Sequence, residues 1–390
     1  MQRKFDVEEL LATARQRTGL SDFGPADFME GLTLLVDDLN TEADIRADRW
    51  DHAQDRLLRL LMNRLWFAKD LTNHPEILNE EIGSPVIIAS LPRTGSTKLH
   101  RMLGASQGFQ TLRWWQAHMF ARIPGLADGG IARRIEETRA FEKWMYQVSP
   151  EMYTGHPMFT DEPEEDQWLM ECTFRHNIPF ASFSASNYVQ WAMTADMQPN
   201  FDYFNAQIKY LQWQEKQFHN NGNTAPWLLK TPNHMGDEQR LTQSLNKPRF
   251  IFTHRDPAKT IPSTVHTGMA MRKPYSDKES RAMFVQSLMI MYPHVTAGHL
   301  RWRDSQTDAE ILDLGFREIT EDGIGTAHKV YDFLGRPFTA AAERGVREWE
   351  RNNPKDKHGK LVHSAADIGL TDDVIRAAFA PYIERYSSYF

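Results

Sequence analysis

The chain has 390 residues, and its 45 lysine and arginine residues stand against 52 aspartate and glutamate residues, which gives a net charge of −7 at neutral pH. A hydrophobic fraction of 41 % and a charged fraction of 25 % are typical of a globular protein with a sizeable core. The acidic balance gives no support for a polyanion-binding surface and argues against a nucleic-acid partner. The single cysteine, Cys172, excludes an internal disulfide and any site built from several cysteine ligands.

The N-terminal segment begins with the charged, helix-patterned stretch MQRKFDVEELLATARQ, which lacks the apolar core of a signal peptide. No later stretch reaches the roughly 18 consecutive apolar residues of a membrane-spanning helix. We therefore expect a cytoplasmic protein without a membrane span. From Trp50 to Ala68 apolar side chains recur at helical intervals, so residues 1–80 are predicted to form a helical cover with one face packed on the body of the protein.

Short apolar segments that alternate with helical sequence follow the N-terminal helices. The predicted strands are 86–90 (VIIAS), 227–230 (WLLK), 249–255 (RFIFTHR) and 311–319 (ILDLGFREI). The first has no polar alternation, as expected for a central parallel strand covered on both faces. A helix is predicted over 325–335, where a glycine and a proline end it. This order predicts an α/β fold, with a three-layer, P-loop-like parallel sheet that carries helices on both faces.

Residues 81–390 are predicted to form this α/β domain, with residues 110–222 inserted as helices between the first two of these strands. The insertion is rich in tryptophan, phenylalanine and tyrosine. Any single aromatic side chain there is most often part of a helical core. As a set beside a ligand loop, these side chains would also line an apolar pocket for a small molecule.

The loop after the first predicted strand has the sequence Pro-Arg-Thr-Gly-Ser-Thr, and Arg93, Thr94, Gly95, Ser96 and Thr97 are its candidate ligand-binding residues. A helix that begins directly after a strand presents free N–H groups to an anion. Gly95 allows close approach of the backbone, and Arg93 adds a cation that can make two hydrogen bonds at once. The pattern Gly-x4-Gly-Lys-Ser/Thr is absent, which disfavours ATP with magnesium. The alternative is an ordinary capped turn.

A second candidate element follows the third predicted strand. In FIFTHRDPAKTIPSTV the strand ends with Arg255, and Ser263 comes eight positions later in the next predicted helix. An arginine at a strand end and a serine two turns into the following helix can converge on one phosphate. The sequence therefore predicts a second phosphate subsite in addition to the loop at 93–97.

These two elements, in this order, resemble the signature motifs of sulfotransferases that use 3′-phosphoadenosine 5′-phosphosulfate (PAPS), especially bacterial members with a PRTGST-type loop. PWLLKTPNHM (226–235) is similar to the Lys-Ser/Thr-Pro-x-His segment of that family, and FREITED, VYDFLGRPF and PKDKHGKLVHSAADIGL resemble its later segments. The likeness covers about 85–103 and 226–375. It implies that the loop at 93–97 holds the 5′-phosphosulfate, and that Arg255 and Ser263 hold the 3′-phosphate.

The resemblance further implies transfer of a sulfuryl group from PAPS to the hydroxyl, or less often the amine, of a small acceptor. Adenosine 3′,5′-bisphosphate (PAP) is left as the product, and no metal is needed. The aromatic insertion favours an apolar or aromatic acceptor. Two alternatives stay open: an ATP-dependent P-loop kinase, and a non-catalytic module that binds adenosine bisphosphate. The oligomeric state is open as well, with a homodimer as one option.

For the base that takes the acceptor proton, His234 is the first candidate, because imidazole titrates near neutrality and the residue follows a strand aimed at the donor site. It lies two positions beyond the histidine of the related Lys-Thr-His pattern. The rival is an acidic cluster in HPMFTDEPEEDQWLM, because neighbouring carboxylates raise one another's pKa. The candidates in that stretch are Glu162, Glu164, Glu165 and, more weakly, His156. A cluster of this kind is usually only an acidic helix N-terminus.

Charge compensation on the leaving phosphate is assigned to Arg93 and to Lys230, although a lysine that ends a strand is commonly solvated. The basic stretch RNNPKDKHGKLVH near the C-terminus is either a solvated loop or a segment that folds over the nucleotide. In related enzymes such a segment reaches the 3′-phosphate, so the resemblance points to Lys357, His358 and Gly359.

Overall fold

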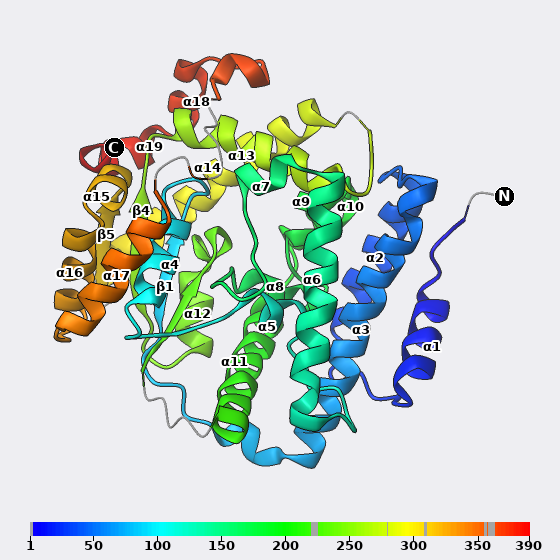
Figure 1. Cartoon of the computed structure of the whole chain (residues 1–390). Helices are drawn as coiled ribbons and strands as arrows, with labels where there is room; N and C mark the ends of the chain where they lie inside the picture. The colour runs from blue at the N-terminus through cyan, green and yellow to red at the C-terminus, as the bar shows by residue number, and fades with distance from the viewer. Residues whose placement is uncertain (1–2, 220–224, 279, 308–309, 355–356, 358–362) are drawn as a thin grey trace.

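The computed structural model describes residues 3–219, 225–278, 280–307, 310–354, 357 and 363–390. Its centre is a five-stranded sheet with the order β2-β3-β1-β4-β5, surrounded by helices (Figure 1). Each neighbouring pair of strands is parallel. The strands are β1 (Val86–Ser90), β2 (Gln110–Thr111), β3 (Trp227–Lys230), β4 (Arg249–His254) and β5 (Ile311–Gly315). The α/β fold with a parallel sheet, predicted from the sequence, is therefore confirmed.

The central position of β1 determines where a ligand can bind. The strand pairs with β3 on one side and with β4 on the other, so that Ile87 lies opposite Leu229 and Phe250. The chain leaves β1 toward the β3 side and later returns on the β4 side. In an open parallel sheet, such a reversal of strand order leaves a crevice outside the carboxyl ends of the strands. The register places Ser90 opposite Thr253, so the loops that follow β1 and β4 are neighbours.

Helices lie along the chain before, between and after the strands. The N-terminal helices are α1 (Val7–Thr18), α2 (Phe28–Thr41) and α3 (Trp50–Asn73). Those between β1 and β3 are α4 (Ser96–Ala105), α5 (Trp114–His118), α6 (Ile131–Val148), α7 (Glu151–Gly155), α8 (Gln167–Met170), α9 (Ile178–Ser182), α10 (Ser186–Ala192) and α11 (Gln198–His219). Those after β3 are α12 (Glu238–Ser244), α13 (Pro257–Arg272), α14 (Arg281–Ser305), α15 (Phe316–Glu321), α16 (Gly323–Phe333), α17 (Ala340–Asn352), α18 (Asp372–Ala378) and α19 (Ala380–Tyr386). Short 3₁₀ turns lie at Ala47–Arg49, Pro75–Asn79, Ala127–Gly130, Glu171–Thr173, Pro232–His234, Ala365–Ile368 and Ser387–Tyr389.

The sheet is covered on both faces because successive side chains of a strand point to opposite sides. Val86 and Ile88 of β1 belong to one hydrophobic cluster, which also contains Leu99 of α4 and residues of α16 and α17. Ile87 and Ala89 belong to a second, larger cluster that includes residues of α11, α12 and α14. Every residue of β1 is buried, which explains why its sequence is apolar without alternation.

The N-terminal helices pack on the second cluster. Trp50, Leu57, Leu61 and Leu65 of α3 are buried and belong to the same cluster as Phe252 of β4. The helical periodicity read from the sequence therefore marks the buried face of α3. The division into residues 1–80 and residues 81–390 stays a prediction. Among the described residues, no helix combines the length and the apolar character that crossing a bilayer requires.

Some predicted boundaries were wrong. The strand predicted over 311–319 ends at Gly315, where α15 begins, because the Glu318 carboxylate accepts a hydrogen bond from the Gly315 N–H (2.6 Å) and caps the new helix. The helix predicted over 325–335 runs over Gly323–Phe333. Strand β2 was not predicted, since its two residues form a strand only through their pairing with Trp227 and Leu228.

Candidate active site

A cavity of about 790 Å³ lies at the carboxyl ends of β1, β3 and β4. Its polar end is lined by the loop after β1 and by the residues that follow β4, including Arg93 and Arg255. Its apolar end is lined by side chains of α8, α9, α13 and α14, such as Trp168 and Phe284. The strand order described above predicts a crevice at this place.

The loop after β1 has the backbone shape of an anion-binding turn. Gly95, with φ +89°, is the residue before α4, and a Cβ there would meet the side chains of Phe316 and Ile319 at 3.4 Å. This left-handed backbone beside a close neighbour suits glycine alone. Ser96 and Thr97 form the first turn of α4 and line the cavity. The first N–H groups of a helix have no partner within it, so those of α4 can bind an anion here.

Arg93 connects three parts of the chain at the polar end. Its Nε donates to Oγ of Ser263 on α13 (3.0 Å), and its Nη1 donates to the carbonyl of Gly155 (2.7 Å). Burial lowers the pKa of Arg93, and the negative charge of Glu165 partly offsets this. The guanidinium is thus held in a poorly solvated place, where a bound anion would find a fixed positive charge.

Thr94 has a different role from its neighbours in the loop. Its hydroxyl contacts the carbonyl of Leu91 (3.0 Å) and Oγ1 of Thr253 on β4 (2.6 Å), and its side chain is fully buried. Among the described residues, Thr94 does not line the cavity. Its side chain therefore fixes the loop against β4, and only its backbone could contact a ligand.

Arg255 stands beside Arg93 at the polar end. Its Nη1 donates to the carbonyl oxygen of Arg93 (3.0 Å), and its guanidinium carbon lies 3.9 Å from the centre of the Phe316 ring. Burial lowers the pKa of Arg255, as does the positive charge of Arg93, while Asp256 opposes both. Ser263 lines the same end of the cavity. The structure therefore brings the predicted residues Arg93, Arg255 and Ser263 together.

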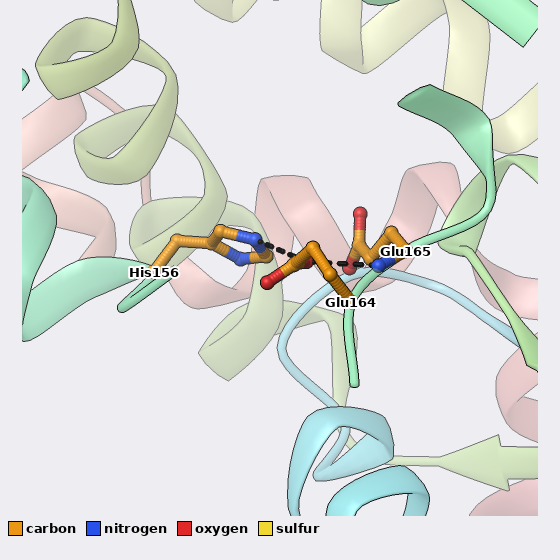
Figure 2. A group of neighbouring side chains, drawn as sticks. All are labelled: His156, Glu164 and Glu165. Atoms are coloured by element: carbon orange, nitrogen blue, oxygen red, sulfur yellow. Dashed lines mark hydrogen bonds and ion pairs between the residues drawn. The ribbon is translucent and has the colours of Figure 1, made fainter. Parts of the chain in front are cut away.

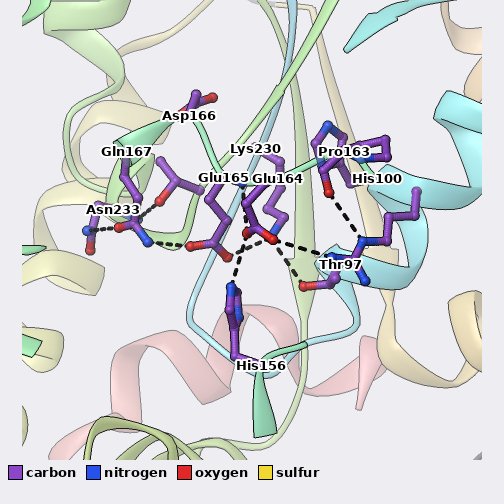
Figure 3. Close-up of polar contacts among 12 residues, drawn as sticks. Thr97, His100, His156, Pro163, Glu164, Glu165, Asp166, Gln167, Lys230 and Asn233 are labelled. Carbon is purple, nitrogen blue, oxygen red and sulfur yellow. Dashed lines mark hydrogen bonds and ion pairs between the residues drawn. The ribbon is translucent and has the colours of Figure 1, made fainter. Parts of the chain in front are cut away.

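Lys230 and Glu165 form a buried ion pair next to this loop. Nζ of Lys230 lies 2.5 Å from Oε1 of Glu165 and donates to Oγ1 of Thr97 (3.2 Å), as Figure 3 shows. Both side chains are buried. A lysine at a strand end is commonly solvated, but Lys230 here connects the acidic cluster to the first turn of α4.

The other oxygen of Glu165 is held by a chain of side-chain amides. Nε2 of Gln167 donates to Oε2 of Glu165, and Oε1 of Gln167 accepts a hydrogen bond from Nδ2 of Asn233 (2.6 Å) (Figure 3). All three residues line the cavity. The Asn233 bond determines which end of the Gln167 amide faces the carboxylate. Sequence reasoning missed Gln167 and Asn233, although Asn233 lies inside the Lys-Thr-Pro-Asn-His stretch that was selected.

The neighbouring Glu164 is engaged inside the protein. Its carboxylate lies 3.0 Å from Nε2 of His156 and 3.3 Å from Nη2 of Arg101, and it accepts the backbone N–H of Glu165 (2.9 Å). Burial raises the pKa of Glu164, but the charges of His156 and Arg101 and the His156 hydrogen bond outweigh it and hold this pKa well below its usual range. Glu164 is therefore a charged structural partner, and it does not line the cavity within the described part of the chain.

His156, Glu164 and Glu165 face one another closely enough to hold a metal ion, with their ligand atoms within 4.8 Å of one another (Figure 2). The carboxylates already have cationic partners, because Arg101 pairs with Glu164 and Lys230 pairs with Glu165. The negative charges of the group are therefore balanced by side chains, and the arrangement is that of an ion-pair network.

His234, the first candidate for the base, lies elsewhere. The 3₁₀ turn Pro232–His234 directs Pro232 and Asn233 to the cavity, whereas the lining within the described residues does not include His234. The His234 side chain is buried, with Nε2 at 2.9 Å from Oδ1 of Asp166. The His234 ring therefore faces Asp166, and within the described residues it does not line the cavity as Glu165 does. Glu162, another member of the acidic cluster, is also absent from the described lining.

The basic C-terminal segment contributes a residue that was not selected from the sequence. Lys357 is exposed, and its Nζ donates to Oδ1 of Asn353 (2.9 Å). The predicted residues His358 and Gly359 lie outside the described residues. His363, in the same basic stretch, lines the cavity. The cluster of basic residues in the sequence pointed to this segment, but it does not indicate which of these side chains lines the cavity.

The insertion at 110–222 supplies only part of the lining at the apolar end of the cavity. Trp168 and Ile178 come from residues 110–222, as expected. Several other lining residues belong to α13 and α14, including Gly268, Met271, Phe284, Leu288, Met291 and Tyr292. A Cβ at Gly268 would lie 2.3 Å from the Phe284 ring, so the ring can occupy this position only because residue 268 has no side chain. No pattern in the sequence predicts that these two helices complete the pocket.

A helix N-terminus after a central strand, two neighbouring arginines and an adjoining apolar pocket are the arrangement expected of a group-transfer enzyme. The model of the sulfotransferase family matches residues 85–340. The chain therefore belongs to the sulfotransferase family.

Two solved structures share its fold. The crystal structure of sulfotransferase STF9 from Mycobacterium avium aligns with a TM-score of 0.84 at 23 % identity, over 98 % of this chain and 98 % of that chain. Sulfotransferase STF1 from Mycobacterium tuberculosis H37Rv aligns with a TM-score of 0.78 at 24 % identity, over 97 % of this chain and 100 % of that chain. No curated protein sequence matches the chain.

Proposed function

We propose that this sulfotransferase transfers the sulfuryl group of PAPS to the hydroxyl, or less often the amine, of a small apolar or aromatic acceptor. The observation that carries the proposal is the division of one cavity into two ends. Arg93, Arg255 and Ser263 gather at the polar end, and Trp168, Phe284 and other apolar side chains line the other. A nucleotide with two phosphate groups suits the first end, and an apolar acceptor suits the second.

In this proposal the first turn of α4 and Arg93 bind the 5′-phosphosulfate, and Arg255 with Ser263 binds the 3′-phosphate. The bond between the acceptor oxygen and sulfur forms while the bond from sulfur to the phosphate oxygen breaks. The electron pair of the broken bond stays on PAP. Lys230 and Arg93 compensate the charge that grows on this oxygen, and a preorganised charge in a poorly solvated site is an efficient way to do so.

Glu165 is the base in this proposal, and it takes the acceptor proton as the new bond forms. Its carboxylate lines the cavity, and Lys230 places it beside the first turn of α4. Gln167 holds its second oxygen. A base must lie within reach of the proton it removes, and geometry takes precedence over pKa in this choice. Glu165 meets this condition better than His234, which is packed against Asp166.

The alternatives have less support at this site. A P-loop kinase would need the Lys-Ser/Thr pair of the triphosphate loop, whereas Thr97 and Lys98 follow Gly95 and Ser96 here. A module that only binds adenosine bisphosphate would have no use for a buried carboxylate held by Lys230 and Gln167 at the border of an apolar pocket.

The direct test is calorimetric titration of the purified protein with PAP, compared with ATP plus magnesium. The proposal expects tight binding of PAP and much weaker binding of ATP. Radiolabelled PAPS and a panel of phenols and aliphatic alcohols would then show transfer. Preference for ATP would contradict the proposed donor.

A further inference from the structure

Two stacked histidine rings lie at the polar end of the cavity. The ring of His363 lies 4.1 Å from that of His266, with an angle of 27° between the planes. His266 is on α13, three positions after Ser263, and residues three apart share one face of a helix. His363 itself lines the cavity that Ser263, Arg93 and Arg255 line. The imidazole is therefore a neighbour of the predicted phosphate-binding groups.

One ring nitrogen of His363 is buried, and within the described part of the chain this Nε2 has no hydrogen-bond partner. A buried polar group without a partner costs free energy, so native structures rarely leave one unless a ligand or water completes the site. His363 is the last residue of the basic stretch at 351–363, and it lines the cavity.

The surroundings of this pair favour the neutral form of both rings. Burial lowers the pKa of His363, as do His266 and Arg93, and only Asp367 raises it. Burial likewise lowers the pKa of His266, together with Arg281 and Arg93, while Glu151 raises it. A doubly charged phosphate beside these rings would reverse this balance, because an opposite charge within about 4–6 Å favours the charged form of a histidine.

We propose that His363 binds an anionic group of the donor nucleotide and takes up a proton when the nucleotide binds. This inference rests on the proposed function, since it requires a donor of the PAPS type at the polar end. Neutral His363 has one N–H, whereas the protonated ring has two, so that proton uptake turns the ring into a charge-assisted donor. Affinity for the donor then rises as the pH falls through the neutral range.

The experiment is calorimetric titration with PAP at pH 7 in two buffers of different ionisation enthalpy, which gives the number of protons taken up. The proteins compared are the unaltered chain, H363Q and, as a matched control, H294Q, whose histidine is exposed on α14 and lies outside the described cavity lining. Phosphate monoesters themselves ionise near pH 6, so the informative quantity is the difference between proteins.

The unaltered chain is expected to take up about half a proton more than H363Q, because an anionic partner shifts a histidine pKa by about 1–3 units. H294Q is expected to match the unaltered chain. Between pH 8 and pH 6.5, PAP affinity should strengthen about threefold more in the unaltered chain than in H363Q. Thermal melting checks that H363Q is folded, and H363N replaces it if it is not.

Equal proton uptake by the unaltered chain and the His363 variants would overturn the inference, as would a loss of uptake in H266Q alone. Failure of the unaltered chain to bind PAP at any pH would instead overturn the proposed function, and this inference with it. The two failures are therefore distinct in the same titration.

Discussion

Replacement of Arg255 by alanine tests the predicted 3′-phosphate subsite. Arg255 follows β4, its Nη1 donates to the carbonyl of Arg93 (3.0 Å), and its guanidinium lies over the Phe316 ring at 3.9 Å. The two cations therefore lie side by side in a partly buried place, and burial together with the charge of Arg93 lowers the pKa of Arg255. A bound phosphate would neutralise the repulsion between these two cations. The loss of Arg255 removes its attraction to the phosphate, and it also removes a guanidinium that is already held in place.

The expected loss follows from the type of contact. A hydrogen bond to a charged group contributes about 1.5–3 kcal/mol, so R255A should raise the Kd for PAP about 10- to 150-fold. The same change removes the bond to the Arg93 carbonyl, which should lower the free energy of unfolding by about 1 kcal/mol. R255K keeps the charge but not the planar, two-pronged geometry, so its Kd should lie between those of the unaltered chain and R255A.

The assay is calorimetric titration with PAP, with thermal melting to establish that each variant is folded. R249A is the matched control, because Arg249 begins the same strand and contacts Glu310 and the carbonyl of Leu334 (3.0 Å), away from the cavity. R249A should bind PAP like the unaltered chain. A folded R255A with an unchanged Kd would refute the 3′-phosphate assignment.

Three further predictions concern the proposed base Glu165, the Gln167 amide that donates to its carboxylate, and the stability of the fold in acid. Glu165→Gln should lower kcat for sulfuryl transfer about 10²- to 10⁴-fold with PAP affinity preserved; labelled PAPS and calorimetry measure both, and an unchanged kcat would reject the base. Gln167→Leu removes a donor from the Glu165 carboxylate, so the acid limb of the rate–pH profile should move up by as much as about one pH unit; an unmoved limb would contradict this. Although burial opposes it, His254 and Arg303 lower the pKa of Asp313 from 3.8 to about 2. The ionised Asp313 therefore adds about 2 kcal/mol to the free energy of unfolding, which is present above pH 4 and lost as the pH falls toward 2. In urea denaturation, Asp313→Asn should therefore lower the free energy of unfolding about half as much at pH 3 as at pH 7; an equal loss at both pH values would contradict this.

The parts of the fold that the sequence predicted are those whose signal is local. The residues of β1 are all buried, which explains the apolar run from Val86 to Ala89. The loop at 93–97 needs a glycine with a left-handed backbone followed by a helix start, and both are visible in a short stretch. Arg255 directly follows a strand, and Ser263 lies two helical turns into the next helix, so their spacing in the sequence is enough to place them at the same end of the sheet. Each of these features depends on neighbours in the sequence.

The features that the sequence did not predict depend on distant neighbours. Strand β2 has two residues and exists only through β3. Gln167 and Asn233 meet because α8 lies beside the turn after β3, 66 positions away in the chain. His234 was selected for its chemistry, but the 3₁₀ turn after Thr231 places the preceding residue in the cavity and turns His234 toward Asp166. A shift of one residue in a turn reverses which side chain faces a ligand, and periodicity cannot resolve it.

The most direct test of the central claim is a crystal structure of the protein with PAP. We expect the 5′-phosphate at the first turn of α4, within hydrogen-bond distance of the N–H groups of Ser96 and Thr97, and the 3′-phosphate at Arg255 and Ser263. A nucleotide bound outside this cavity, or one with its 5′-phosphate away from the loop at 93–97, would contradict the account.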